Sequence, residues 1–191
     1  MRRNRTVFID LLFLLVLTML VTMIVREPVL KSEIEQKAEY LIEMVWQDDS
    51  ASDIDLWFQA PDGRRVSFQQ KQNGVYSLDR DDLGQRNDII SLPDGTTRVI
   101  RLNREILTMR GWQAGTYTVN VFGYTMREDS VNVTVTWYRL NPFKVLVART
   151  TVLTERGQEM TIASLTLDET GIVTNRSFDP VQVARAKNSP F

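Results

Sequence analysis

The chain has 191 residues, a formal net charge of −1 at pH 7, 43% hydrophobic residues, and neither cysteine nor histidine. Without cysteine it has no disulfide and no thiol nucleophile, and without histidine it lacks the commonest general base and metal ligand. The near balance of acidic and basic residues disfavours a nucleic-acid partner, which requires a concentrated basic surface. These features predict a protein that is not an enzyme and binds no nucleic acid.

The first long stretch of the chain, residues 6–25, is almost entirely apolar. At about 1.5 Å per residue it is long enough to cross the ~30 Å hydrocarbon core of a bilayer. Three arginines lie in residues 1–5 and acidic residues follow from Glu27 on, so the positive-inside rule places residues 1–5 in the cytoplasm. The run is too long for a signal peptide and no small-residue cleavage site follows it. We therefore expect a single transmembrane helix at residues 6–25, retained as an anchor.

One ionisable residue, Asp10, lies inside this stretch, about one helical turn from its start. A charged carboxylate there costs a few kcal/mol on insertion scales. Three threonines have angular positions on the helix that differ only gradually from that of Asp10, namely Thr6, Thr18 and Thr22. Their hydroxyls form a loose polar stripe with it, which would face a partner helix or a water path. Asp10 is therefore a candidate ion carrier. The alternative is that Asp10 lies at the headgroup boundary and pairs with Arg5, while the threonines bond to their own helix.

The sequence Thr-Val-Phe-Ile-Asp at residues 6–10, with the aliphatic run up to residue 17, resembles the N-terminal helix of the ExbD/TolR family, which is related in role to MotB. These proteins are the B subunits of ion-driven motors in the bacterial inner membrane. The resemblance implies a homodimer of single-span subunits surrounded by a polytopic A-type subunit of the ExbB/TolQ/MotA kind, which forms a pentamer. It also implies that Asp10 takes up and releases a proton or a sodium ion, and that the C-terminal domain is periplasmic.

Residues 26–49 contain one amphipathic pattern. Apolar residues recur at helical spacing from Leu30 to Val45, and lysines and glutamates occupy the other face. Ser32 and Glu35 have the spacing of a helix cap. The pattern predicts a short linker helix, which either forms a parallel dimer stalk or packs on the domain that follows.

Beyond the linker the period of the apolar residues changes from about 3.6 to 2. Ile54, Leu56 and Phe58 occupy alternate positions, and Pro-Asp-Gly turns occur at residues 61–63 and 93–95. We therefore expect a mainly β protein, with an antiparallel β-sandwich of about eight strands at residues 50–176. Residues 177–191 are expected to form a flexible tail.

Two segments of this region resemble pre-peptidase C-terminal-like sandwiches. Residues 53–57, Asp-Ile-Asp-Leu-Trp, and the turn at 61–63 resemble their opening hairpin, while residues 111–119 resemble a later strand. The resemblance implies a jelly-roll-like binding domain without catalysis of its own. It departs from ExbD and TolR, which carry a small α/β domain, and from MotB, which carries an OmpA-like domain.

The densest charged run lies at residues 78–88. Its Asp79 and Asp81, together with Asp53 and Asp55, are hard oxygen ligands of the kind that binds calcium. The run lacks the glycine and the terminal glutamate of an EF-hand loop, so the alternative is a solvated or self-paired loop. No other cofactor is expected.

These patterns together predict a B-type subunit of a proton-driven or sodium-driven inner-membrane motor. Ion flow through Asp10 would be coupled to a periplasmic β-sandwich output domain that acts on a periplasmic or envelope target. The alternative function is a membrane-anchored envelope binding module that transports no ion.

Overall fold

The computed structural model describes residues 2–25 and 37–184, and the chain divides into two units between Glu35 and Gln36. The first unit contains one helix, α1 (Arg2–Val25), so the N-terminal helix predicted from the sequence is confirmed as a helix. Every side chain described in it, from residue 7 to residue 21, is exposed. Within the described residues, no helix combines the length and the apolar character that a membrane span requires.

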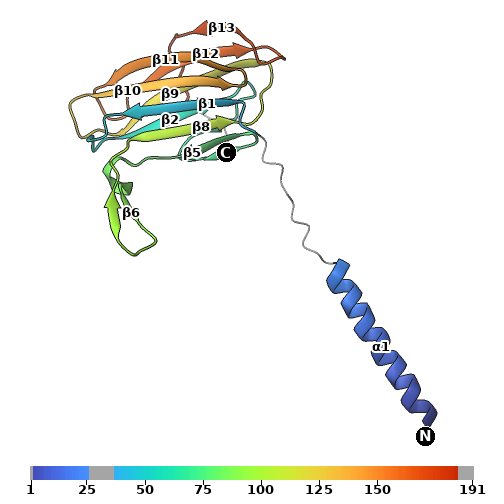
Figure 1. Cartoon of the computed structure of the whole chain (residues 1–191). Coiled ribbons are helices and arrows are strands. Elements are labelled where there is room, and N and C mark those ends of the chain that lie inside the picture. Colours follow the sequence, from blue (N-terminus) through green and yellow to red (C-terminus); the bar gives the residue numbers. More distant parts are fainter. Residues whose placement is uncertain (1, 26–36, 185–191) are drawn as a thin grey trace. The chain divides into compact units, whose positions relative to one another are not determined.

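The second unit is built from antiparallel strands, which confirms the mainly β class (Figure 1). Two sheets stack with their facing sides around one hydrophobic core, to which both contribute. The described residues contain thirteen strands, some only two residues long, where the sequence predicted about eight. The first sheet has the spatial order β11 (Phe143–Leu153), β10 (Val131–Leu140), β1 (Tyr40–Trp46), β8 (Arg104–Met109), β5 (Tyr76–Arg80) and β4 (Gln72–Asn73). The second has the order β13 (Val173–Ser177), β12 (Glu159–Leu167), β9 (Gly115–Thr125), β2 (Asp53–Gln59) and β3 (Arg65–Val66).

The prediction of a linker helix at residues 26–49 is wrong for the C-terminal part of that range. There the chain forms β1, which pairs with β10 on one side and β8 on the other. Aromatic and apolar side chains at positions 40, 42, 44 and 46 are buried, and the residues between them are half-buried. This period of 2, with pairing along both edges, overrides the helical spacing of the other apolar residues. Residues 26–36 of the predicted helix lie outside the described residues.

The sandwich also extends beyond the predicted residues 50–176 at its C-terminal end. After β13 the chain continues along the second sheet, where Val183 is buried and its N–H donates to Glu159 Oε1 at 2.7 Å. The carbonyl of Val181 accepts a 2.6 Å bond from Asn120 Nδ2. The first part of the tail predicted to be flexible, residues 178–184, is therefore packed, because it has a buried apolar anchor and paired backbone groups. Residues 185–191 lie outside the described residues.

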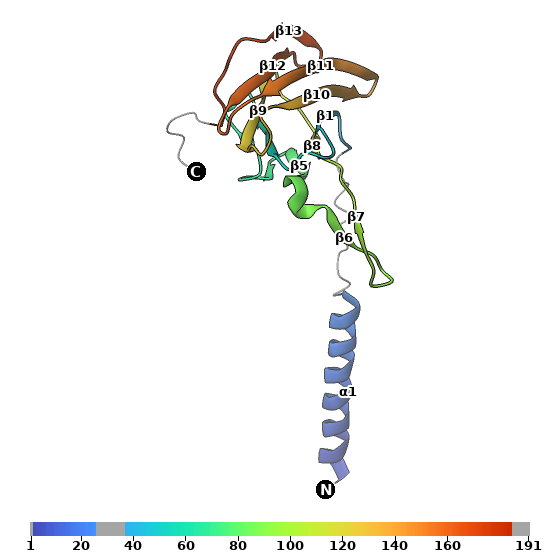
Figure 2. The same ribbon diagram turned by 90° about the vertical axis from the view of Figure 1, so that its left-hand side faces the viewer.

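Between β5 and β8 the chain forms a short helix, η1 (Gly84–Asn87), and a separate hairpin of β6 (Ile89–Ser91) and β7 (Thr97–Val99). Figure 2 shows this hairpin projecting from the body of the sandwich. Its apolar side chains are exposed, with Ile89 at 67% and Val99 at 57%. The hairpin belongs to neither stacked sheet, and its strands pair only with each other among the named strands.

Candidate functional site

Three carboxylates, two on strands and one directly after a strand, converge beside the edge of β2 that β3 leaves unpaired. Asp55 on β2, Asp81 directly after β5, and Glu105 on β8 each place an oxygen within 4.8 Å of the other two. Asp55 is 3% exposed and Glu105 is fully buried. We call these three residues the acidic cluster. Because β2 belongs to one sheet and β5 and β8 to the other, the cluster forms only when the sheets stack.

The alternation along β8 points Glu105 into the sandwich. Leu107 and Met109, which follow it on the same face, are buried in the hydrophobic core. Glu105 Oε2 accepts a 2.7 Å hydrogen bond from the N–H of Leu56 on the opposite sheet. The short β3 pairs only with the last two residues of β2, so this N–H lies beyond its ladder. Glu105 therefore joins the two sheets through a backbone group that β3 does not reach.

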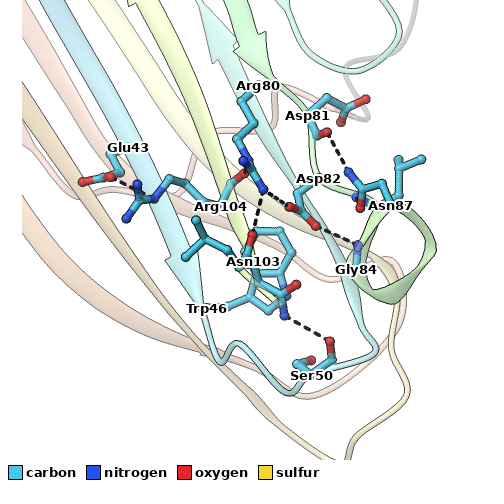
Figure 3. Close-up of polar contacts among 12 residues, drawn as sticks. Glu43, Trp46, Ser50, Arg80, Asp81, Asp82, Gly84, Asn87, Asn103 and Arg104 are labelled. Atoms are coloured by element: carbon cyan, nitrogen blue, oxygen red, sulfur yellow. Dashed lines mark hydrogen bonds and ion pairs between the residues drawn. The ribbon is translucent and has the colours of Figure 1, made fainter. Parts of the chain in front are cut away.

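The position of Asp81 depends on the contacts that hold the loop around it. Arg80 donates to Asp82 Oδ2 at 2.9 Å and to two backbone carbonyls around the start of β8, and Asp82 Oδ1 accepts the N–H of Gly84 at 3.1 Å. Gly84 has a φ of +62°, and a Cβ there would lie 2.8 Å from the carbonyl oxygen of Ser52. A glycine is thus required where the loop approaches the segment before β2. In Figure 3 the side chain of Asp81 points away from the Arg80–Asp82 pair.

The electrostatics of the acidic cluster disfavour its ionised form. Burial raises the pKa of Asp55 to about 8, and the charges of Asp53 and Asp81 add to the shift. Burial also raises the pKa of Glu105 well above its ordinary value, and it raises that of the neighbouring Asp53 to about 6. Lys71 Nζ, 2.8 Å from Asp81 Oδ2, makes the only ion pair with the cluster in the described part of the chain.

Four buried carboxylate oxygens at this place have no hydrogen-bond partner among the described residues. They are Asp53 Oδ1, Asp55 Oδ2, Asp81 Oδ1 and Glu105 Oε1. Buried acceptors in folded proteins are nearly always satisfied, so a group of four needs an explanation. Such oxygens can share protons with one another, or they can coordinate a hard cation.

Of the four residues predicted as calcium ligands, the structure brings Asp55 and Asp81 together with Asp53 beside them, but it separates Asp79. Asp79 accepts hydrogen bonds from Ser77 at 2.5 Å, Thr108 at 2.7 Å and Arg110 at 3.2 Å. Burial raises the pKa of Asp79, but these bonds outweigh it and the net shift is downward.

The reason for this separation is a shift of register in β5 between residues 78 and 80, where one extra residue turns the strand. Glu105, which completes the cluster, was missed by the sequence interpretation. The sequence did contain an indication of it: Glu105 is a charged residue that alternates with Leu107 and Met109, and so occupies a position on the same strand face as these apolar residues.

On α1, Asp10 is exposed. Thr18 Oγ1 donates to the carbonyls of Leu14 and Leu15, each at 2.9 Å, so its hydroxyl bonds to its own helix as one alternative predicted. Thr6 and Thr22 belong to the helical backbone, but their side chains lie outside the described residues.

Comparisons of the chain with protein-family models, with curated proteins and with solved structures found no match.

Proposed function

We propose that the protein is the single-span B-type subunit of an ion-driven motor in the bacterial inner membrane, anchored by α1 with its N-terminus in the cytoplasm. Asp10 is the observation that carries this proposal. It is the one carboxylate among the described side chains of α1, residues 7–21, which are otherwise apolar apart from Thr18 and are all exposed. Exposed apolar surface of this extent requires lipid or a protein partner, and an ionisable residue within it marks a functional position.

In this function Asp10 alternates between a neutral and an ionised carboxyl group. The neutral form tolerates apolar surroundings, while the ionised form costs a few kcal/mol there unless it meets water or a cation. Uptake and release of a proton or a sodium ion therefore decide which surface of a partner subunit the helix can face. One charge that moves through 100 mV supplies ~2.3 kcal/mol, so several ions together can perform mechanical work.

The proposal requires two kinds of partner. A second copy of this chain supplies a second Asp10, and a polytopic A-type subunit of the ExbB/TolQ/MotA kind, as a pentamer, surrounds the two helices. The sandwich, which we assign to the jelly-roll-like class without catalysis of its own, transmits the motion to a periplasmic or envelope target. Its separation from α1 as an independent unit suits an output domain.

The test begins with the full chain purified from its native host in a gentle detergent, with mass spectrometry of the proteins that accompany it. We expect a stoichiometric polytopic membrane protein, with two copies of this chain in each complex. The complex is then reconstituted into vesicles, and ion uptake driven by a membrane potential is measured. Asp10→Asn keeps the size of the side chain but cannot ionise, so we expect intact assembly and a flux at background.

Asp94→Asn is the matched control, because it makes the same chemical change in the exposed turn between β6 and β7, where Asp94 Oδ1 accepts hydrogen bonds from the N–H and the hydroxyl of Thr96. We expect this variant to assemble and to conduct ions like the wild type. Full ion flux in the Asp10→Asn complex, or a chain that purifies without any polytopic partner, would contradict the motor function.

A surface groove favours a second candidate function, a membrane-anchored envelope binding module that transports no ion. The groove has a volume of about 700 Å³ and lies among β11, β12 and residues 178–182. Arg149 forms one wall, with its guanidinium 5.2 Å from the centre of the Phe178 ring and hydrogen bonds to the carbonyls of Thr161 and Ile162. This volume is within the range of small-ligand sites.

The two functions differ in what they require of α1. If the protein is a binding module, a chain in which an unrelated apolar anchor replaces residues 1–25 complements a deletion strain as well as the wild type does. If it is a motor subunit, that chain reaches the membrane but does not complement the deletion. Quantification of the protein in isolated membranes controls for its insertion.

A further inference from the structure

We propose that the acidic cluster, with Asp53 beside it, binds a divalent cation, and that this cation is calcium. The inference concerns the sandwich alone and does not depend on the function proposed for Asp10.

The side chain of Glu105 is fully buried. One of its oxygens accepts from Leu56 N, and the other, Oε1, has no partner within the described residues, while the side chain belongs to the acidic cluster. A buried carboxylate oxygen left in this condition is strongly unfavourable. A cation bound between Glu105, Asp55 and Asp81 would coordinate a carboxylate oxygen of each of the three residues at once.

The spacing and the type of the ligands indicate which cation. The chain has no histidine and no cysteine, and the converging atoms are all carboxylate oxygens, which suit calcium and magnesium rather than zinc or copper. Calcium takes about six to eight oxygen ligands in irregular geometry, carboxylates among them, whereas magnesium requires a near-ideal octahedron and keeps several of its waters. A buried group of three carboxylates on three different segments suits the less demanding ion, calcium.

The excess of negative charge at the acidic cluster also favours a bound cation. Asp53, Asp55, Asp81 and Glu105 supply four carboxylates, while Lys71 pairs with Asp81 and the charge of Arg86 acts on Asp53. Burial and mutual repulsion raise the pKa of Asp53, Asp55 and Glu105, so the cation-free cluster is a high-energy arrangement when it is ionised. A divalent cation reverses that electrostatic balance and favours the ionised carboxylates.

Shared protons are the competing explanation. Asp81 and Glu105 lie close enough to hold a proton between them, and that proton would satisfy one oxygen of each residue. It would leave Asp53 Oδ1 and Asp55 Oδ2 without a donor. A cation serves all three carboxylates of the acidic cluster, Asp55 included, and for this reason we favour it.

The experiment uses the full chain in detergent, treated with a chelator and then dialysed. Calcium chloride and, separately, magnesium chloride are titrated into it by isothermal calorimetry, and the melting temperature is recorded with and without each ion. For the wild type we expect one calcium ion per chain. At about a hundredfold excess over the Kd we expect the melting temperature to rise by about 5 to 10 °C.

Glu105→Gln is the principal variant, because its side-chain oxygen still accepts from Leu56 N while one charge is lost. Asp81→Asn is the second variant, at a less buried position, and it decides the matter if Glu105→Gln does not fold. We expect calcium affinity to fall by about tenfold or more in each. Asp79→Asn is the matched control, and we expect it to bind calcium like the wild type, since Asp79 lies outside the cluster.

Each result has a defined meaning. No heat and no thermal shift with calcium in the wild type would overturn the proposal and leave proton sharing as the explanation. Unchanged affinity in the folded Glu105→Gln or Asp81→Asn variant would overturn the location. Magnesium binding as tight as calcium binding would overturn the choice of ion. None of these results bears on ion flux through Asp10.

Discussion

Glu128 and Glu105 are two glutamates that each join separate segments of the sandwich, but they differ in the number of hydrogen bonds that they accept. Glu128 Oε1 accepts from the N–H of Ala51 at 2.7 Å, and Oε2 accepts from the hydroxyls of Ser50, at 2.9 Å, and Ser52. Glu105 accepts one bond, from Leu56, and faces two other carboxylates. The first site is complete with protein groups alone.

The two sites show what surrounding donors do to a partly or fully buried carboxylate. Burial raises the pKa of Glu128, but bonds from Ser52, Ala51 and Ser50 outweigh this effect and the net shift is downward. At Glu105 burial dominates, since one backbone donor is offset by neighbouring negative charge, and the pKa is raised. Hydrogen-bond donors therefore make an ionised glutamate stabilising at one site, and their shortage makes it destabilising at the other.

The largest effect is expected from Glu105→Gln in the presence of a chelator. The change removes the titratable group, keeps the acceptor for Leu56 N and adds an amide N–H that can donate to the neighbouring carboxylates, so we expect the free energy of unfolding at pH 7 to rise by about 2 kcal/mol. Urea denaturation of the full chain in detergent measures it. A clear loss of stability would show that the ionised Glu105 is already satisfied without a cation, which would remove the contrast between the two sites.

The same substitution at the other site is expected to act in the opposite direction. Glu128→Gln weakens the bonds from Ser50, Ala51 and Ser52, so we expect the free energy of unfolding at pH 7 to fall by about 1 kcal/mol. The same denaturation experiment measures it, with and without calcium. The loss should not depend on calcium, and a gain in stability would contradict our interpretation of this site.

A dependence on pH follows from the lowered pKa of Glu128. A group whose pKa is lower in the folded state stabilises the protein above its unfolded value, here 4.5, and this contribution is lost as the pH falls through the folded pKa. The difference in stability between the wild type and Glu128→Gln should therefore be constant above pH 4.5 and shrink below it. Chemical denaturation of both proteins at pH 7, 5, 4 and 3 checks this, and an undiminished difference at pH 3 would contradict it.

The smallest effect is expected at Asp79. Asp79→Asn keeps an oxygen that can accept from Thr108, and the ion pair that it loses, with Arg110, joins two side chains that are each 35% exposed, so it contributes little. We expect Asp79→Asn to lower the free energy of unfolding by about 0.5 kcal/mol, equally with and without calcium. A calcium-dependent loss would place Asp79 in the cation site and would remove its use as a control.

The sequence predicted the fold best where one period was unambiguous. Ile54, Leu56 and Phe58 alternate strictly, and all three are buried on β2. Prediction failed at residues 40–46, where helical and strand spacings were both present and pairing with two neighbouring strands decided between them. The candidate site was predicted in part, because regular alternation would place Asp79 with Asp81, and the register shift in β5 separates them.

The sequence by itself determined the supply of groups: an apolar helix with one carboxylate at Asp10, alternating strands, and acidic residues without histidine or cysteine. Only the tertiary structure decided which carboxylates meet. Glu105 contacts Leu56 across 49 positions of the chain and between two different sheets. Periodicity fixes the face to which a side chain points, but the stacking of the sheets fixes what lies opposite it. For this reason the acidic cluster, unlike Asp10, could not be identified before the strands were assembled.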